Sequence, residues 1–163
     1  MRIDIRPATE ADYPAIVALN ESVVEMTSPM DLARLKQLSA AAEYLRVVDI
    51  EHAFAGFLLA FRAGADYANT NFDWFSARYR DFVYIDRIVI ASDAAGAGLG
   101  SRLYEDLFHW ARQRGVPFAT CEYNLSPPNP PSAAFHRRHG FREVGTQASG
   151  SAKTVSMQLR PID

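Results

Sequence analysis

A glycine-rich segment near the middle of the chain is the clearest candidate for chemistry. It reads Ala95-Gly96-Ala97-Gly98-Leu99-Gly100-Ser101 and joins a predicted strand to a predicted helix. Backbone N–H groups at a helix start can converge on an anion, and the helix dipole adds positive potential. Glycine permits positive φ and lets a phosphate approach the main chain. We therefore expect a pyrophosphate, which both coenzyme A and NAD carry, to bind at Gly96, Ala97, Gly98, Leu99, Gly100 and Ser101.

Other interpretations of this segment exist. A tight turn that only needs small residues is the simplest. A Rossmann dinucleotide site fits Gly96-x-Gly98 and the distance to Glu122, but Ser101 stands where that fingerprint has Gly or Ala. The chain after Asn124 also cannot supply the further parallel strands of such a fold. A Walker P-loop is excluded, because no lysine follows the glycines.

Two carboxylates on predicted strands could move a proton. Glu122 is our first candidate for a general base, acting directly or through a water; the alternative is a strand glutamate that is solvated or ion-paired. Asp86 interrupts an otherwise apolar strand, so its carboxylate must be paired or face an opening. We expect no pairing with Arg87, because neighbours on a strand point to opposite faces. Asp86 is therefore the second candidate.

His136 and Cys121 are the other side chains with reactive groups. The ordinary pKa of histidine, about 6.5, makes imidazolium a competent acid near neutral pH, so His136 could protonate a leaving group. The alternative is a partly exposed histidine in a cationic last helical turn. Cys121 should face away from Glu122 as a buried, inert thiol, with a covalent route as the minor alternative. The four histidines show no convincing ligand spacing, so we expect no metal.

The segment from Ala63 to Asp81 has no clear period and is predicted to be a long loop. It carries several aromatic residues, among them Trp74 and Phe75. We expect these two to form the wall of a substrate site, through apolar packing or cation–π contact. The alternative is a lid fastened to the core by its own aromatic side chains.

The elements that position these residues follow from hydrophobic periodicity and turn signals. Their order, β-α-α-β-β-β-α-β-α-β-β, predicts an α/β fold with a mixed sheet and one parallel crossover, Phe82 to Asn124. The strands are expected at Arg2–Arg6, Tyr44–Asp49, Ala53–Phe61, Phe82–Ile90, Phe118–Asn124, Arg142–Gln147 and Thr154–Leu159. The helices are expected from an N-cap at Thr9 to about Glu21, and at Asp31–Leu38, Leu99–Arg114 and Ser132–His139. Tight turns are expected at Glu51-His52 and Ser149-Gly150-Ser151.

Length and composition limit the class of protein. The 163 residues predict one domain, 1–163, with 48% hydrophobic and 22% charged residues. A net charge of -2 without a basic block argues against nucleic acid or an anionic membrane as partner. One cysteine fits a reducing cytosol. No apolar run approaches the roughly 20 residues of a membrane span, and charges interrupt the first apolar stretch, so we expect a cytoplasmic protein.

Two motifs in the right order resemble the GNAT superfamily of N-acetyltransferases. The family pattern R/Q-x-x-G-x-G/A after an aliphatic strand resembles Ile88-Val89-Ile90 followed by Ala95 and Gly98-Leu99-Gly100. A second family pattern, N-x-x-S/A-x-x-L/F-Y-x-x-x-G-F, resembles the run from Asn129 to Phe141. The opening Ile5-Arg6-Pro7-Ala8 is also typical, so the resemblance covers nearly the whole chain.

The resemblance implies an enzyme that moves an acetyl group from acetyl-CoA to a small-molecule or peptide amine. Main-chain groups of Ile88, Val89 and Ile90 would then pair with the pantetheine arm, and Asn129 would contact the cofactor near its reactive end. The sheet would splay between Phe82–Ile90 and Phe118–Asn124 to admit the thioester. Glu122 resembles by position the glutamate of ribosomal-protein alanine N-acetyltransferases. A homodimer is common for this family.

Two departures from the family pattern keep other functions open. Ala95 stands where the family has Arg or Gln, so a side-chain contact with phosphate is lost. His136 stands where the family has its catalytic tyrosine, which puts the usual general acid in doubt. The alternative function is therefore a non-catalytic acyl-CoA-binding or sensor module with the same fold. A dinucleotide-dependent oxidoreductase is a third hypothesis.

Overall fold

The computed structural model describes residues 1–150 and 152–163, which divide into two compact units. The N-terminal unit comprises Met1–Phe61, Ala65–Tyr67 and Ile85–Leu107. The C-terminal unit comprises Arg62–Gly64, Ala68–Tyr84 and Phe108–Asp163. Strand β4 and helix α4 each contribute residues to both units.

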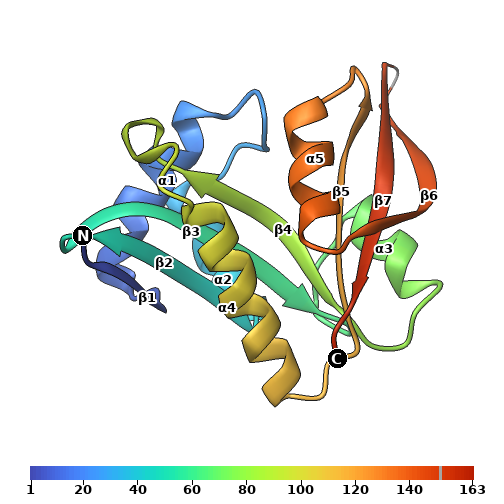
Figure 1. The fold of residues 1–163 in the computed structure, drawn as a ribbon, viewed down its shortest axis with the longest axis horizontal. Coiled ribbons are helices and arrows are strands. Elements are labelled where there is room, and N and C mark those ends of the chain that lie inside the picture. Colours follow the sequence, from blue (N-terminus) through green and yellow to red (C-terminus); the bar gives the residue numbers. More distant parts are fainter. Residues whose placement is uncertain (151) are drawn as a thin grey trace. The chain divides into compact units, whose positions relative to one another are not determined.

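The described residues form a seven-stranded mixed sheet in the order β1-β2-β3-β4-β5-β7-β6 (Figure 1). The predicted α/β class with a mixed sheet is confirmed. The strands are β1 (Ile3–Pro7), β2 (Tyr44–Ile50), β3 (Ala53–Arg62), β4 (Val83–Ile90), β5 (Phe118–Ser126), β6 (Arg142–Ser149) and β7 (Lys153–Pro161). The helices are α1 (Tyr13–Ser22), α2 (Leu32–Ala41), α3 (Thr70–Ser76), α4 (Leu99–Gln113) and α5 (Pro130–Arg138). None of these helices is long and apolar enough to cross a membrane.

In the N-terminal unit, helix α4 packs on an antiparallel hairpin. Strands β2 and β3 are joined by Glu51 and His52, whose φ angles of 49° and 67° confirm the predicted tight turn. Tyr44 and Arg46, two residues apart on β2, point to the same face of the sheet. Both donate to the carboxylate of Asp106 on α4, which Figure 1 draws across β2 and β3. This carboxylate fixes α4 on the sheet.

In the C-terminal unit, β5 is the central strand. It is parallel to β4, with Val83 beside Ala119, and antiparallel to β7, with Met157 beside Glu122. The parallel pairing confirms the predicted β-α-β crossover through α4. Helices α3 and α5 belong to the same unit and pack near β5 (Figure 1).

The prediction of a long loop between Ala63 and Asp81 is wrong, because this segment contains α3. Asn69 caps the helix by accepting from the backbone N–H groups of Asn71 and Phe72. Phe72 and Phe75 form its buried face. A helix of only seven residues offers too few positions for a 3.6-residue period to stand out among other aromatic residues.

The other predicted boundaries differ from the observed ones by a few residues, as expected for helix and strand ends. The predicted first helix begins with a 3-10 turn, Glu10–Asp12, before α1 starts at Tyr13. Asp31, the predicted first residue of the second helix, is its N-cap and accepts a hydrogen bond from Arg34 N. Of the predicted turn Ser149-Gly150-Ser151, Ser151 lies outside the described residues.

An ion pair fixes the start of α1 to the sheet. Arg6 donates to both carboxylate oxygens of Asp12, at 2.8 Å each, and its Nε donates to Asp49. Asp12 also accepts from the backbone N–H of Thr9, the predicted N-cap. The hydrogen bonds from Arg6 lower the pKa of Asp12 from 3.8 to about 2.

We predict that Asp12→Asn lowers the free energy of unfolding at pH 7 by about 1–2 kcal/mol. Because the folded-state pKa is depressed, this stabilisation is complete above pH 4 and declines as the pH falls toward 2. Urea unfolding of both proteins between pH 7 and 3 would measure the difference. A difference that stays constant down to pH 3 would contradict this assignment.

Candidate functional site

The glycine-rich turn has the geometry that binds anions. Gly96 and Gly98 have φ angles of 86° and 74°, which favour glycine, and an added Cβ would meet no atom within 4 Å at either position. Arg102 N donates to Gly98 O at the start of α4, so the glycine turn leads directly into the first turn of the helix. The first turn of this 15-residue helix carries no acidic side chain. The turn is therefore open, and it lies at the positive end of a long helix.

Small residues beside this turn leave a hollow in the N-terminal unit. Ala95 ends the short 3-10 turn Ser92–Ala94 and contributes no polar side-chain atom. A cavity of about 350 Å³ adjoins it, lined by Met1, Ile50, Ala53, Phe54, Ala55, Asp93, Ala94, Ala95 and Ala97. Any phosphate bound here would depend on main-chain donors rather than on a side chain at position 95.

The end of β4, which carries Ile88, Val89 and Ile90, lies very close to β3. A Cβ added at Gly56 would come within 2.6 Å of the carbonyl oxygen of Val89 and 3.2 Å of the Cα of Ile90. Ala91 N donates to Ala55 O just beyond this point. Gly56 therefore sets how closely the predicted pantetheine-binding strand approaches its neighbour.

The expectation that Asp86 does not pair with Arg87 is wrong. Nε of Arg87 lies 2.6 Å from Oδ2 of Asp86, and the side chains are only 8% and 4% exposed. The long arginine side chain curls back toward its neighbour, which the direction of its Cβ does not prevent. The other oxygen of Asp86 accepts from the hydroxyl of Tyr67. Asp86 is thus hydrogen-bonded at both oxygens in a buried ion pair.

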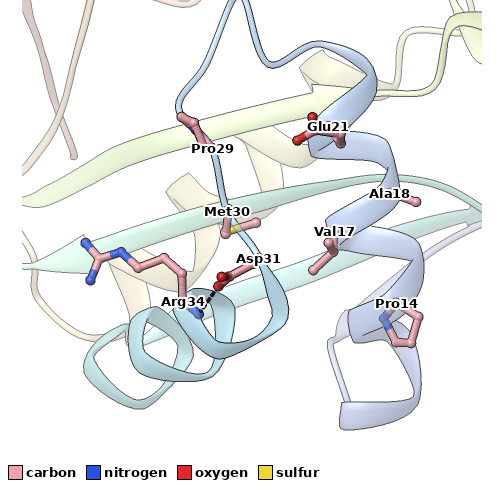
Figure 2. Close-up of a pocket in the computed structure, with 8 residues that line it drawn as sticks. All are labelled: Pro14, Val17, Ala18, Glu21, Pro29, Met30, Asp31 and Arg34. Atoms are coloured by element: carbon pink, nitrogen blue, oxygen red, sulfur yellow. Dashed lines mark hydrogen bonds between the residues drawn. The ribbon is translucent and has the colours of Figure 1, made fainter.

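Arg87 also holds the segment between α1 and α2. Its guanidinium donates to the carbonyl oxygen and hydroxyl of Ser28, and Nδ2 of the buried Asn20 donates to the same carbonyl. These bonds position Pro29 and Met30 at one side of a cavity of about 510 Å³ (Figure 2). The lining residues are Pro14, Val17, Ala18, Glu21, Pro29, Met30, Asp31 and Arg34. No pattern of residues in the sequence indicated this cavity.

Glu122 accepts a hydrogen bond from a tyrosine that we did not single out from the sequence. The hydroxyl of Tyr84 donates to Oε1 of Glu122 at 2.6 Å, and Tyr84 is 1% exposed. A carboxylate has about four acceptor positions, so this bond occupies part of its capacity. Both residues lie on predicted strands, but no sequence pattern specifies which residues of two parallel strands are adjacent.

His136 is buried, in contrast to the alternative of a partly exposed helix histidine. It is 7% exposed, and the rings of Tyr123, Phe135 and Phe141 lie 5.3–5.6 Å away between centroids. Burial lowers the pKa of His136 below 6.5. The neutral imidazole therefore predominates at pH 7, and burial makes the imidazolium form that we considered as a proton donor less favourable.

The tautomer of His136 follows from its contact with the preceding helical turn. Nδ1 lies 2.7 Å from the carbonyl oxygen of Ser132. Because a carbonyl only accepts, the hydrogen is on Nδ1, and in the neutral ring Nε2 is the acceptor nitrogen.

The side chains of Glu122 and His136 lie on opposite faces of β5. Successive strand residues alternate, so Glu122 shares a face with the Tyr84 contact, while Tyr123 faces His136. Cys121 lies on the Tyr123 face and is 3% exposed, as expected for a buried thiol. The two candidate proton-handling groups are thus separated by the strand itself.

Trp74 and Phe75, the expected substrate wall, differ in burial, because Phe75 belongs to the core of the C-terminal unit and Trp74 is half-buried. Phe75 is fully buried, with ring centroids of Phe82 and Tyr84 at 6.0 and 6.1 Å. The guanidinium of Arg78 lies 3.8 Å from the Trp74 ring centroid, and a Cβ at Gly145 would come within 2.4 Å of that ring. Phe75 thus fastens the segment to the core, whereas a substrate contact of Trp74 stays a prediction.

Asn129 is the N-cap of α5. Its Oδ1 accepts from Ser132 N at 3.3 Å, and two prolines follow it in the first turn. Its side-chain oxygen is thus used within the protein. No group of three or more His, Cys, Asp or Glu side chains that could hold a metal occurs in residues 1–150 and 152–163.

Comparison with known proteins identifies the family. The sequence model of the acetyltransferase (GNAT) family matches residues 10–141, more than half of the chain. The chain belongs to the GNAT acetyltransferase family, and the resemblance read from the two motifs is confirmed. No curated protein matches the chain in sequence.

Solved structures of the family share the fold. A ribosomal-protein-alanine N-acetyltransferase from Brucella melitensis superposes with a TM-score of 0.74 at 25% identity, covering 97% of this chain and 99% of that one. Ard1 from Thermoplasma volcanium gives 0.80 at 14% identity, with 100% and 99% covered. The structure of yncA from Salmonella typhimurium with its cofactor acetyl-CoA gives 0.72 at 18% identity, with 100% and 95% covered.

We predict that an isolated negative charge at Gly98 weakens coenzyme A binding. Gly98→Asp places a carboxylate where the pyrophosphate is expected, whereas Gly98→Asn has nearly the same shape and tolerates positive φ equally well. The dissociation constant of the aspartate variant should exceed that of the asparagine variant at least about tenfold, which is ~1.4 kcal/mol. Calorimetric titration with coenzyme A would measure both. Equal affinities in two folded variants would remove the anion site from this turn.

We predict that His136 titrates below pH 6.5 and carries its hydrogen on Nδ1 when neutral. Long-range ¹H–¹⁵N correlation spectra of the imidazole, recorded between pH 5 and 8, would report both properties. Comparison with His136→Gln would assign the signal. A midpoint at or above 6.5, or an Nε2–H tautomer, would show that the ring is not held as described.

Proposed function

We propose that this protein transfers an acetyl group from acetyl-CoA to a primary amine by direct attack. The observation that carries the proposal is the open glycine turn at the start of α4, where Gly96 and Gly98 adopt positive φ. The pyrophosphate of acetyl-CoA would bind main-chain N–H groups at this helix start, without any need for a side chain at Ala95. Within the N-terminal unit, main-chain groups of Ile88, Val89 and Ile90 hold the pantetheine arm.

Glu122 removes the proton from the amine in this proposal. An amine attacks only when neutral, yet a lysine side chain has an ordinary pKa of about 10.4 and an α-amine about 7.7–8. Glu122 accepts that proton, directly or through a water, as the amine nitrogen bonds to the carbonyl carbon. Asp86 is less suited to this role, since both its oxygens accept hydrogen bonds within a buried ion pair.

The leaving thiolate does not depend on an imidazolium. A thiol has an ordinary pKa of about 8.5, so coenzyme A can leave as the thiolate and take up a proton afterwards. His136, neutral and held through Nδ1, contributes a polar nitrogen on the α5 face of β5. Its substitution for the family tyrosine then changes the shape and polarity of the site without removing an obligatory acid.

The acceptor in this proposal is a small-molecule amine or the α-amine of a peptide. Two observations support the peptide class. Glu122 resembles by position the glutamate of ribosomal-protein alanine N-acetyltransferases, and the Brucella melitensis structure at 25% identity bears that name. Incubation with acetyl-CoA and a panel of amines, amino acids and N-terminal peptides, read by thiol release, tests the proposal.

The alternative function, a non-catalytic acyl-CoA-binding module, is favoured by Ala95 and His136 at positions where the family has other residues. It differs from the enzyme in one measurable outcome. Coenzyme A would bind in calorimetry, but no amine of the panel would release thiol. Tight binding of NAD without binding of coenzyme A would instead exclude both functions.

We predict that Glu122→Gln lowers kcat on the best acceptor by 10²–10⁴-fold, the usual contribution of a positioned base. Its dissociation constant for coenzyme A should change much less, because the amide keeps the size of the side chain and lies apart from the glycine turn in sequence and secondary structure. Steady-state kinetics together with calorimetry would separate the two effects. Unchanged turnover would take the base role away from Glu122.

A further inference from the structure

We propose that Tyr84 is a positioning residue for Glu122, holding its carboxylate ionised and in one orientation for proton transfer. This inference rests on the proposed function for its catalytic meaning. Its physical core is the bond from the Tyr84 hydroxyl to Oε1 of Glu122, at 2.6 Å, within the C-terminal unit. That distance is short for an O–H donor to an oxygen acceptor and is typical of a bond to a charged carboxylate.

The sheet register places the two residues for this bond. Tyr84 on β4 lies beside Thr120 on β5, and Glu122 is the next residue of β5 that points to the same face. Two residues along a strand span about 6.6 Å, which the length of a tyrosine side chain can bridge. Thr120 in turn donates to the carbonyl oxygen of Val83, which adds a side-chain bond to the ladder at this point.

The ring of Tyr84 is held by α3. The ring centroids of Phe72 and Phe75 lie 5.7 and 6.1 Å from that of Tyr84, and all three residues are at most 3% exposed. Because the ring is packed in this way, its hydroxyl oxygen is held in place and meets the carboxylate in a fixed geometry. This gives α3, the element that the sequence did not predict, a role in orienting the site.

A donor that is already in place favours the charged form of a carboxylate over its protonated form. It therefore keeps Glu122 able to accept a proton at lower pH and limits its rotation. The same bond also reduces the proton affinity of Glu122. Tyr84 therefore makes Glu122 a weaker base but increases the fraction of it that is ionised. The effect should be visible as a change in pH dependence rather than only as a loss of rate.

The sheet register places residues without ionisable side chains beside Glu122. From β7, Met157 lies opposite it, and from β5, Thr120 and Asn124 share its face. From α3, Phe72 and Phe75 cover Tyr84, and the charged residue of that helix, Asp73, is exposed. Cys121 and Tyr123 point to the other face. Tyr84 is the titratable group whose hydrogen bond to Glu122 the variants below test.

The experiment compares Tyr84→Phe with Tyr79→Phe. Each variant loses one hydroxyl from the same aromatic cluster, since the Tyr79 ring contacts Phe75 and Phe118 at centroid distances of 6.3 and 5.6 Å. Carboxyl ¹³C spectra of glutamate-labelled protein, assigned with Glu122→Gln, give the titration midpoint of Glu122 in each protein. Near-UV circular dichroism and thermal unfolding establish that the variants are folded.

We expect Tyr84→Phe to raise the titration midpoint of Glu122 by about one pH unit, and Tyr79→Phe to leave it unchanged. The acidic limb of the kcat profile should move to higher pH by the same amount in Tyr84→Phe. The shift in that limb should be absent when Tyr84→Phe is combined with Glu122→Gln.

Two results would overturn the proposal. An unchanged midpoint would show that the hydroxyl does not act on the carboxylate, and an equal loss of kcat at every pH would assign Tyr84 a merely structural or a direct catalytic role. The NMR measurement needs no turnover, so it decides the Tyr84–Glu122 coupling even if no amine releases thiol. Absence of thiol release with a shifted midpoint would instead count against the proposed acetyl transfer.

Discussion

The parallel pairing of β4 and β5 is the constraint on which the rest of the site depends. Parallel strands cannot be joined by a tight turn, so the chain must cross over through α4. The crossover starts where β4 ends, which puts the glycine turn and the positive helix end at that point. It returns at the start of β5, and the register that begins with Val83 beside Ala119 brings Tyr84 to Glu122. One pairing thus sets both the place of the glycine turn and the contact between Tyr84 and the candidate base.

Alternation along β5 gives the two candidate proton-handling groups different surroundings. Glu122 meets a hydroxyl donor, which favours its ionised form. His136, on the opposite face, is enclosed by aromatic rings that disfavour its charged form. The strand therefore separates a carboxylate that accepts a hydrogen bond from an imidazole whose pKa is lowered by burial. A single strand can maintain this contrast because each face is covered by its own helix.

Much of the fold could be predicted from the sequence because the signals are local. Positive φ at Gly96, Gly98 and the Glu51-His52 turn follows from residue type or from tight connection length. The order of strands and helices follows from periodicity over ten or so residues. Helix α3 was missed because seven residues give a weak period, and its aromatic residues also suit a substrate wall.

The contacts of the candidate site were less accessible to sequence reasoning. Asp86 and Arg87 pair because a long side chain can reverse direction, which strand alternation does not describe. Tyr84 and Glu122 meet because of a register between strands 38 positions apart in the chain. The tautomer of His136 depends on a carbonyl one helical turn earlier, and its lowered pKa depends on burial among three aromatic rings. Each of these depends on tertiary packing, whereas residue types and spacing only identified the candidates.

The burial of Cys121 determines how fast a thiol reagent can modify the protein. The chain has one cysteine, and its sulfur lies on the α5 face of β5 with 3% of the residue exposed. A thiol reagent can reach it only when α5 lifts away or the sheet opens, so its rate of modification reports local opening of that face. The reactivity of this thiol therefore measures local opening at β5, the strand that also carries Glu122.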